Sequence, residues 1–160
     1  MYYPDFSAHE MKPAIIAFDA HRTGGGSVCL GWCLCTESAV VLENRLLVAN
    51  TEGPLPPKTH TEVMTLLRLI EEVGFEGRLV TDYAKSGEVA SVVLTMLAVC
   101  VGWNTALPPV IKLFNTDVDE LTTGRYHNPC EHSLHVAQAA SSLMASVLRH
   151  NKRRRFNGYR

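Results

Sequence analysis

Two aspartates follow short predicted strands in this sequence. Asp19 comes directly after the apolar run 14–18, and Asp82 comes directly after residues 78–81, whose centre is Leu79 and Val80. Apolar runs this short, bounded by polar residues and glycines, are typical of buried strands. Phosphodiester hydrolysis by metal ions needs carboxylates that converge from rigid elements. The two acids therefore predict a metal site if their strands are neighbours, and turn or cap roles are the alternative.

Two histidines lie three residues apart near the start of a predicted helix. Asn128 and Pro129 are a helix-start signal, with Asn as the N-cap and Pro in the first turn. His132 and His135 then share one helical face and become candidate ligands or catalytic groups. Imidazole binds Mn²⁺ better than it binds Mg²⁺. Glu131 is either a further ligand or, more simply, a capping partner, and ordinary surface or core positions are the alternative for both histidines.

Other acids and thiols offer weaker signals. Glu62 is a candidate ligand on a helix predicted to start at Thr59, but the spacing of these two residues is also that of a capping box. Asp117 lies in an acidic loop that is expected to be solvated. Three cysteines lie along one predicted strand, and these are Cys29, Cys33 and Cys35. Their spacing favours buried thiols over a zinc-binding knuckle.

The bulk properties indicate one globular domain. Apolar residues make up 46% of the 160-residue chain, and the formal net charge is −1. We expect a leader at 1–12, a domain at 13–150 and a basic tail at 151–160. An odd number of cysteines, five, without a secretory signal predicts reduced thiols and a cytoplasmic location.

The pattern of apolar residues gives an order of elements. The expected strands are 13–18, 28–36, 40–48, 78–81 and 110–114, and the expected helices are 59–73, 87–103 and 129–149. The order β-β-β-α-β-α-β-α predicts an α/β protein with a five-stranded mixed sheet flanked by helices. This order matches the ribonuclease-H-like fold, in which the first and fourth strands are parallel neighbours, so that Asp19 and Asp82 would converge.

Three segments together resemble the RuvC-type Holliday junction resolvases, and the compact length resembles phage or viral members. The first is Ile-Ile-Ala-Phe-Asp19, followed after a turn by Leu30-Gly-Trp-Cys-Leu34. The second is Leu79-Val-Thr-Asp-Tyr83, followed by Lys85-Ser-Gly and an apolar helix. The third is Glu131-His-Ser-Leu-His135 with its alanine-rich continuation. The resemblance covers about residues 13 to 150.

The resemblance implies a metal-dependent endonuclease that cuts Holliday junctions or other branched DNA in recombination, repair or replication. It implies Mg²⁺ or Mn²⁺ as cofactor and a homodimer through residues 87–103. The expected metal-binding and catalytic residues are Asp19, Asp82, His132 and His135, with Glu62 and Glu131 as further candidates. The expected phosphate contacts are Lys85, Arg125, Lys152, Arg153, Arg154 and Arg155.

This sequence departs from the family at the site. The central acid is Asp82 where the family usually has glutamate, and His132 and His135 stand where it usually has aspartates. A metal site with fewer acids implies one of three outcomes. The enzyme prefers Mn²⁺, it uses another acid as a ligand, or the protein binds branched DNA without cutting it. A ribonuclease H acting on RNA–DNA hybrids is a further alternative, and it would need Glu62 as a ligand.

Overall fold

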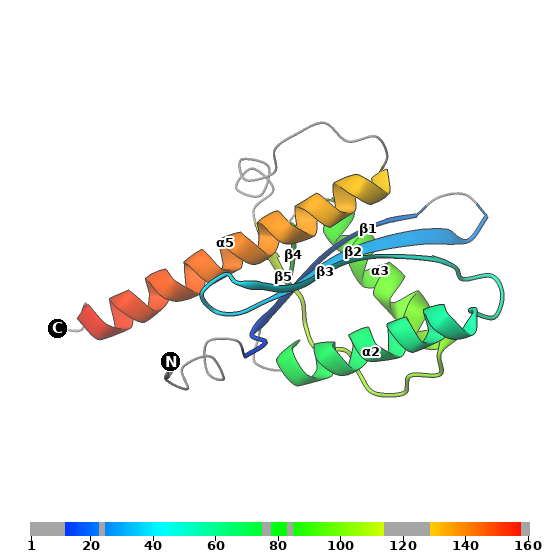
Figure 1. Ribbon diagram of the computed structural model, residues 1–160, viewed down its shortest axis with the longest axis horizontal. Coiled ribbons are helices and arrows are strands. Elements are labelled where there is room, and N and C mark those ends of the chain that lie inside the picture. Colours follow the sequence, from blue (N-terminus) through cyan, green and yellow to red (C-terminus); the bar gives the residue numbers. More distant parts are fainter. Residues whose placement is uncertain (1–11, 23–24, 75–77, 83–84, 114–128, 158–160) are drawn as a thin grey trace, which may run out of the picture.

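The computed structural model has three layers, with a mixed sheet between helices (Figure 1). It describes residues 12–22, 25–74, 78–82, 85–113 and 129–157. Within these ranges, the side chains at 74, 82, 85–88, 112–113, 129–131 and 152–157 lie outside the description. The predicted α/β class and the predicted order of strands and helices are confirmed.

Five strands form the sheet in the order β3-β2-β1-β4-β5. The strands are β1 (Ile15–Arg22), β2 (Ser27–Cys35), β3 (Val41–Asn50), β4 (Leu79–Asp82) and β5 (Ile111–Leu113). The first three strands are antiparallel, β4 runs parallel to β1, and β5 runs parallel to β4. The helices are α2 (Pro57–Gly74), α3 (Lys85–Cys100) and α5 (Pro129–Asn157). The expected parallel pairing of the first and fourth strands is therefore present.

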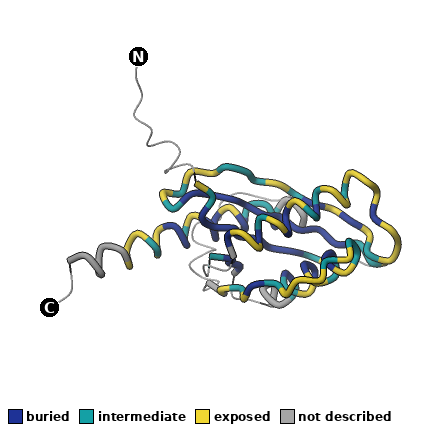
Figure 2. The backbone as a smooth tube through the Cα atoms, turned by 90° about the horizontal axis from the view of Figure 1, so that it is seen from below, coloured by how far each residue is buried: buried dark blue, intermediate teal, exposed yellow. Residues whose placement is uncertain are grey.

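The alternation of side chains along β1 divides the core into two parts. Ile16, Phe18 and Ala20 pack with residues of α2 and α3, whereas Ile15 and Ala17 pack with residues of α5. The sheet is thus covered on both faces, and its strands form the buried centre of the molecule (Figures 1 and 2). Any polar residue at an odd-numbered position of β1 belongs to the α5 face.

The first strand is longer than predicted, and Asp19 lies inside it. This strand was predicted to end at Phe18, but β1 continues to Arg22, which pairs with Val28 of β2. The polar residues did not end the strand because the hairpin partner supplies backbone hydrogen bonds for its full length. Asp82 is likewise the last residue of β4, and the expectation that both acids lie just past strand ends was wrong.

Several helix boundaries differ from the prediction. Helix α2 begins at Pro57, so Thr59 lies in its first turn and is not its N-cap; proline suits that first position because its missing N–H needs no partner there. Helix α3 ends at Cys100, where the amides of Gly102 (φ 70°) and Trp103 donate to Val99 and Ala98 in a Schellman arrangement.

Helix α5 runs to Asn157, well beyond the predicted end near Arg149, and it extends past the sheet in Figure 1. The basic segment at its end lacks glycine and proline up to Asn157, so nothing in its sequence interrupts the helix. Residues 151–157 therefore belong to α5 and do not form a separate tail.

Helix α5 packs very close to β2 at Gly31. A Cβ built on Gly31 would lie 2.5 Å from the carbonyl carbon of Ser133 and 2.6 Å from the amide nitrogen of Leu134. The residues of α5 that are buried against the sheet are mostly small; they include Ser133, Ala137, Ala140, Ser141 and Ala145. Small side chains on both partners therefore set the distance between helix and sheet.

The cysteines of β2 are buried thiols, as predicted. Cys29, Cys33 and Cys35 take part in no disulfide and are at most 1% exposed. The Ser141 hydroxyl of α5 lies 3.3 Å from the Cys33 sulfur. Burial raises the pKa of Cys33 above its ordinary value, and burial together with the neighbouring Cys33 raises the pKa of Cys35 to about 11.

Among the described residues, no helix has the length and apolar character needed to cross a membrane.

Replacing Gly31 tests the close approach of α5. We expect Gly31→Ala to lower the free energy of unfolding by about 2–3 kcal/mol, because the new Cβ meets backbone atoms that cannot rotate away. Gly53→Ala is the matched control, since nothing lies within 4 Å of its Cβ position. Urea denaturation of both variants measures the difference. Equal stability of the two variants would contradict the close contact.

Thiol labelling tests the burial of the cysteines. In the folded protein at pH 8, we expect Cys33 and Cys35 to react with iodoacetamide far more slowly than the half-buried Cys100. Because burial raises the pKa of both thiols, the folded protein favours their neutral form. Their contribution to the free energy of unfolding is therefore present below pH 9 and is lost as the pH rises toward 11. Mass spectrometry of labelled peptides measures the rates, and equal rates would argue against the burial.

Candidate functional site

Asp19 is a buried carboxylate on the α5 face of the sheet. The residue is 1% exposed, and its partner across the antiparallel ladder is Gly31 of β2. Because Gly31 is the position where α5 touches β2, the first turns of α5 lie beside Asp19. A carboxylate buried this deeply requires a compensating positive charge, a set of donors or a bound cation.

Asp82 occupies the position on β4 that corresponds to Asp19 on β1. The two parallel strands are aligned with Ala17 beside Val80, and both of these side chains belong to the α5-side core. Asp19 and Asp82 each lie two residues further along, so the backbone register brings them to the same level of adjacent strands. The side chain of Asp82 lies outside the described part of the structure.

Two histidines lie next to Asp19. His21 follows two residues later on β1, and its Nε2 is 3.6 Å from Oδ2 of Asp19, an ion-pair distance when the imidazole is protonated. The ring of His21 meets the ring of His132 on α5, with the centroids 6.0 Å apart and the planes tilted by 49°. Asp19, His21 and His132 therefore form a polar cluster between β1 and the start of α5.

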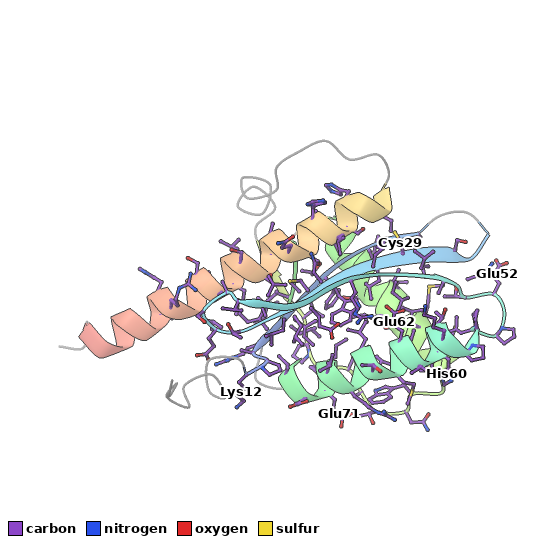
Figure 3. The ribbon with its side chains drawn as sticks, viewed as in Figure 1. Lys12, Cys29, Glu52, His60, Glu62 and Glu71 are labelled. Atoms are coloured by element: carbon purple, nitrogen blue, oxygen red, sulfur yellow. The ribbon has the colours of Figure 1, made fainter. Side chains whose placement is uncertain are left out.

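The remaining predicted ligands lie on helices α5 and α2. His135 is half-buried and lies three residues after His132 on α5. Glu131 is in the first turn of the same helix, and its side chain lies outside the description. Glu62 is half-buried on α2, which packs on the other face of the sheet from α5. In Figure 3, Glu62 and Cys29 lie on opposite sides of the sheet, and Cys29 is the residue of β2 that pairs with His21.

Most of the predicted DNA contacts cannot be placed. Lys85 begins α3, and residues 152–155 continue α5, but their side chains lie outside the description. Arg125 and Asp117 lie outside the described residues altogether.

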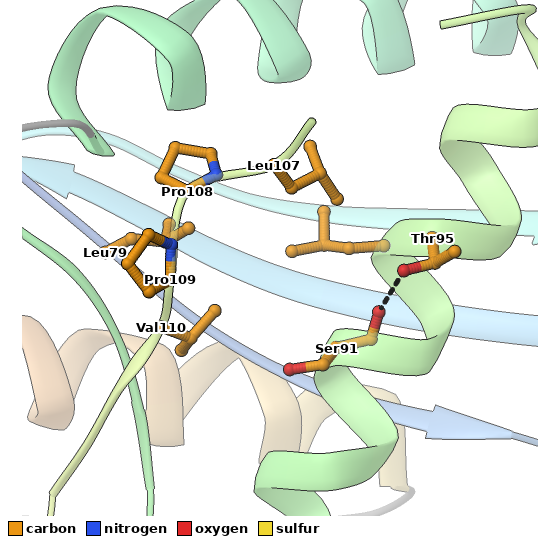
Figure 4. Close-up of a pocket in the computed structure, with 8 residues that line it drawn as sticks. Leu79, Ser91, Thr95, Leu107, Pro108, Pro109 and Val110 are labelled. Atoms are coloured by element: carbon orange, nitrogen blue, oxygen red, sulfur yellow. Dashed lines mark hydrogen bonds between the residues drawn. The ribbon is translucent and has the colours of Figure 1, made fainter. Parts of the chain in front are cut away.

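The described side chains do not form a ready metal site. No group of three His, Cys, Asp or Glu side chains is close enough to hold an ion as the described residues stand. One apolar pocket of about 240 Å³ lies between α3 and residues 107–110 and is lined by Leu79, at the opposite end of β4 from Asp82 (Figure 4). Its lining has no titratable side chain, so we assign the polar cluster at Asp19 as the candidate site.

His21 was not among the residues predicted from the sequence. The first strand was predicted to end at Phe18, which left His21 outside it and on no particular face. Once β1 is extended to Arg22, the two-residue alternation puts Asp19 and His21 on the same face. The signal that could have found His21 is this spacing of two.

No family model, curated protein or solved structure matches the chain.

Proposed function

We propose that this protein is a metal-dependent nuclease with a ribonuclease-H-like fold that cuts branched DNA, such as a four-way junction. The observation that carries the proposal is that Asp19 and Asp82 lie at the same level on two adjacent parallel strands. The approach of His132 to the same end of β1 supports it. The order of strands and helices supports the fold, and the three sequence segments that resemble RuvC-type resolvases support the substrate class.

The types of donor suit a divalent cation, although no three of the described side chains lie close enough together to hold one. Carboxylate oxygens suit Mg²⁺ and Mn²⁺, and imidazole nitrogens suit Mn²⁺. Asp19 and Asp82 would hold the ion, with His132 and His135 completing the site. When bound, the ion would activate a water molecule and neutralise charge on the phosphate.

The protein's own residues provide the rigid support for this chemistry. Asp19 is buried on the central strand β1, where it pairs with Gly31 of β2, so its carboxylate has little freedom to move. One of the two half-buried histidines, His132 or His135, would exchange a proton with a bound phosphate or water in place of binding the ion. The basic segment 152–155 and Lys85 would bind phosphates of the DNA.

Two alternatives have less support. A ribonuclease H would use Glu62, and Glu62 lies on a helix that packs against the other face of the sheet. A protein that binds branched DNA without cutting it is favoured by the histidines at positions where related enzymes carry acids, and the cleavage assay below separates it from the nuclease.

Cleavage of a synthetic four-way junction tests the proposal. We expect the wild-type protein to nick the junction with Mn²⁺ or Mg²⁺, and we expect Asp19→Asn and Asp82→Asn each to lower the rate at least 100-fold, because each removes a charged ligand. Denaturing gels of end-labelled strands measure the rate.

Glu71→Gln is the matched control for these variants, since Glu71 is an exposed carboxylate on α2 (Figure 3). Equal cleavage by the wild type and Asp19→Asn would reject the nuclease. Binding of the junction without cleavage would favour the non-cutting alternative, and cleavage of an RNA–DNA hybrid that depends on Glu62 would favour the ribonuclease H.

Helix α3 supports the proposed homodimer. Val92 and Val99 are seven residues apart on this helix and are 43% and 74% exposed. Residues seven apart lie on one helical face, so both valines belong to one apolar surface.

We expect Val99→Asp to shift the protein toward the monomer in sedimentation-velocity experiments, because a charge would be buried in the dimer interface. Val48→Asp on β3 is the control, since Val48 is also well exposed, at 59%, but lies on another element. A wild-type protein that is monomeric at all concentrations would exclude the dimer.

A further inference from the structure

The charges of helix α5 are distributed unevenly along its length. Its one acid is Glu131, in the first turn, and the sequence has no aspartate or glutamate from 132 to 160. Cationic residues gather at its other end, at 149 and at 152–155. The whole chain has a formal net charge of −1, so this helix is a local concentration of positive charge. Such a surface favours a polyanion as its ligand.

One face of α5 leads from the candidate site to these cations. Six polar residues three or four positions apart form a single stripe along the helix, and these are His135, Gln138, Ser142, Ser146, Arg149 and Arg153. The four residues from 138 to 149 are exposed, and His135 is half-buried. The α5 stripe therefore carries amide, hydroxyl and cationic groups and no acid. Side chains of these kinds make most contacts to nucleic-acid phosphates.

Two contacts with the sheet orient side chains of the α5 stripe. Nδ2 of Asn44 donates to Oε1 of Gln138 at 3.2 Å, a bond that does not use the amide nitrogen of Gln138. Arg149 donates to the carbonyl oxygen of Glu37 at 3.4 Å, and the carboxylate of Glu37 is paired with Arg78. Because Arg78 neutralises that carboxylate, Glu37 does not cancel the charge of Arg149.

The α5 stripe has a fixed length, because α5 is one straight helix that extends past the sheet (Figure 1). From position 135 to position 153 the helix rises about 27 Å, at about 1.5 Å per residue. A B-DNA duplex rises about 3.4 Å per base pair, so about eight base pairs match this length.

The apolar face of α5 argues for nucleic acid over a lipid surface. A basic helix that binds an anionic membrane needs an exposed apolar face to enter the lipid. On α5, Val136, Ala140 and Met144 are buried in the core against the sheet. The polar stripe is therefore the face that α5 offers to a ligand.

We propose that the α5 stripe binds one duplex arm of a branched DNA over about eight base pairs. The arm runs from the candidate site at Asp19 toward the cations at the end of α5. This inference rests on the proposed function, because it takes branched DNA as the ligand, and it adds the path of one arm and the shortest arm that the protein binds tightly.

Binding of junctions without any divalent metal tests this inference separately from cleavage. Two four-way junctions with arms of about 5 and about 12 base pairs, each arm closed by a hairpin loop, carry a fluorophore and are titrated with the protein in EDTA. Fluorescence anisotropy measures the dissociation constants. We expect the wild type to bind the long-armed junction at least tenfold more tightly, because only the longer arm reaches from the site to position 153.

The double variant Arg149→Ala/Arg153→Ala removes both arginines of the α5 stripe. We expect it to bind the two junctions with nearly equal affinity. For the long-armed junction, the slope of the logarithm of the binding constant against the logarithm of salt concentration should become about two less steep. Arg45→Ala/Arg68→Ala is the matched control, because these exposed arginines lie on β3 and α2, and it should keep the wild-type preference.

Ser146→Glu tests the α5 stripe without removing a cation. An acid in the middle of the stripe would repel phosphates, so we expect about tenfold weaker binding of the long-armed junction. Melting temperatures identify any variant that fails to fold, and Ser146→Glu decides the question if the double arginine variant is unfolded.

The outcomes separate this inference from the proposed function. Equal affinity of the wild type for both junctions, or an unchanged arm-length preference in the folded variants, would overturn the path along α5 even if the junction is cut. A preference for long arms that depends on the α5 stripe, in a protein that leaves every DNA substrate intact, would support the path and reject the nuclease.

Discussion

The contact between α5 and the centre of the sheet is the constraint on which the candidate site depends. Gly31 has no side chain, and the backbone of α5 at Ser133 occupies the space that a Cβ would need. The small residues along the buried face of α5, from Ser133 to Ala145, keep this part of the helix close to β1 and β2. Because the position of the helix is set by backbone contact, the residue before Ser133, His132, is brought against His21 on the sheet.

This arrangement also explains how the protein accommodates a buried carboxylate. Asp19 lies between two strands and beneath a helix, where a lone negative charge would be costly. The neighbouring imidazole of His21 compensates this charge when it is protonated.

The two faces of the sheet carry different kinds of side chain. The face covered by α2 and α3 is an apolar core of large side chains, including Phe18, Trp32 and Leu66. The α5 face combines small apolar residues and buried thiols with the polar cluster at the far end of β1. Such a division lets one side supply most of the stability, while the other side tolerates polar groups whose burial costs free energy.

The sequence by itself determined the class of the fold and the order of its elements, and it indicated Asp19 and Asp82 as candidate ligands. These features depend on local apolar patterns and on strand order, which a single sequence carries. It could not determine that β1 continues through polar residues to Arg22, because that length comes from pairing with β2. Nor could it determine that His21 and His132, more than 100 residues apart, come into contact. Only the tertiary structure decided this, because the contact follows from the close packing of α5 on Gly31.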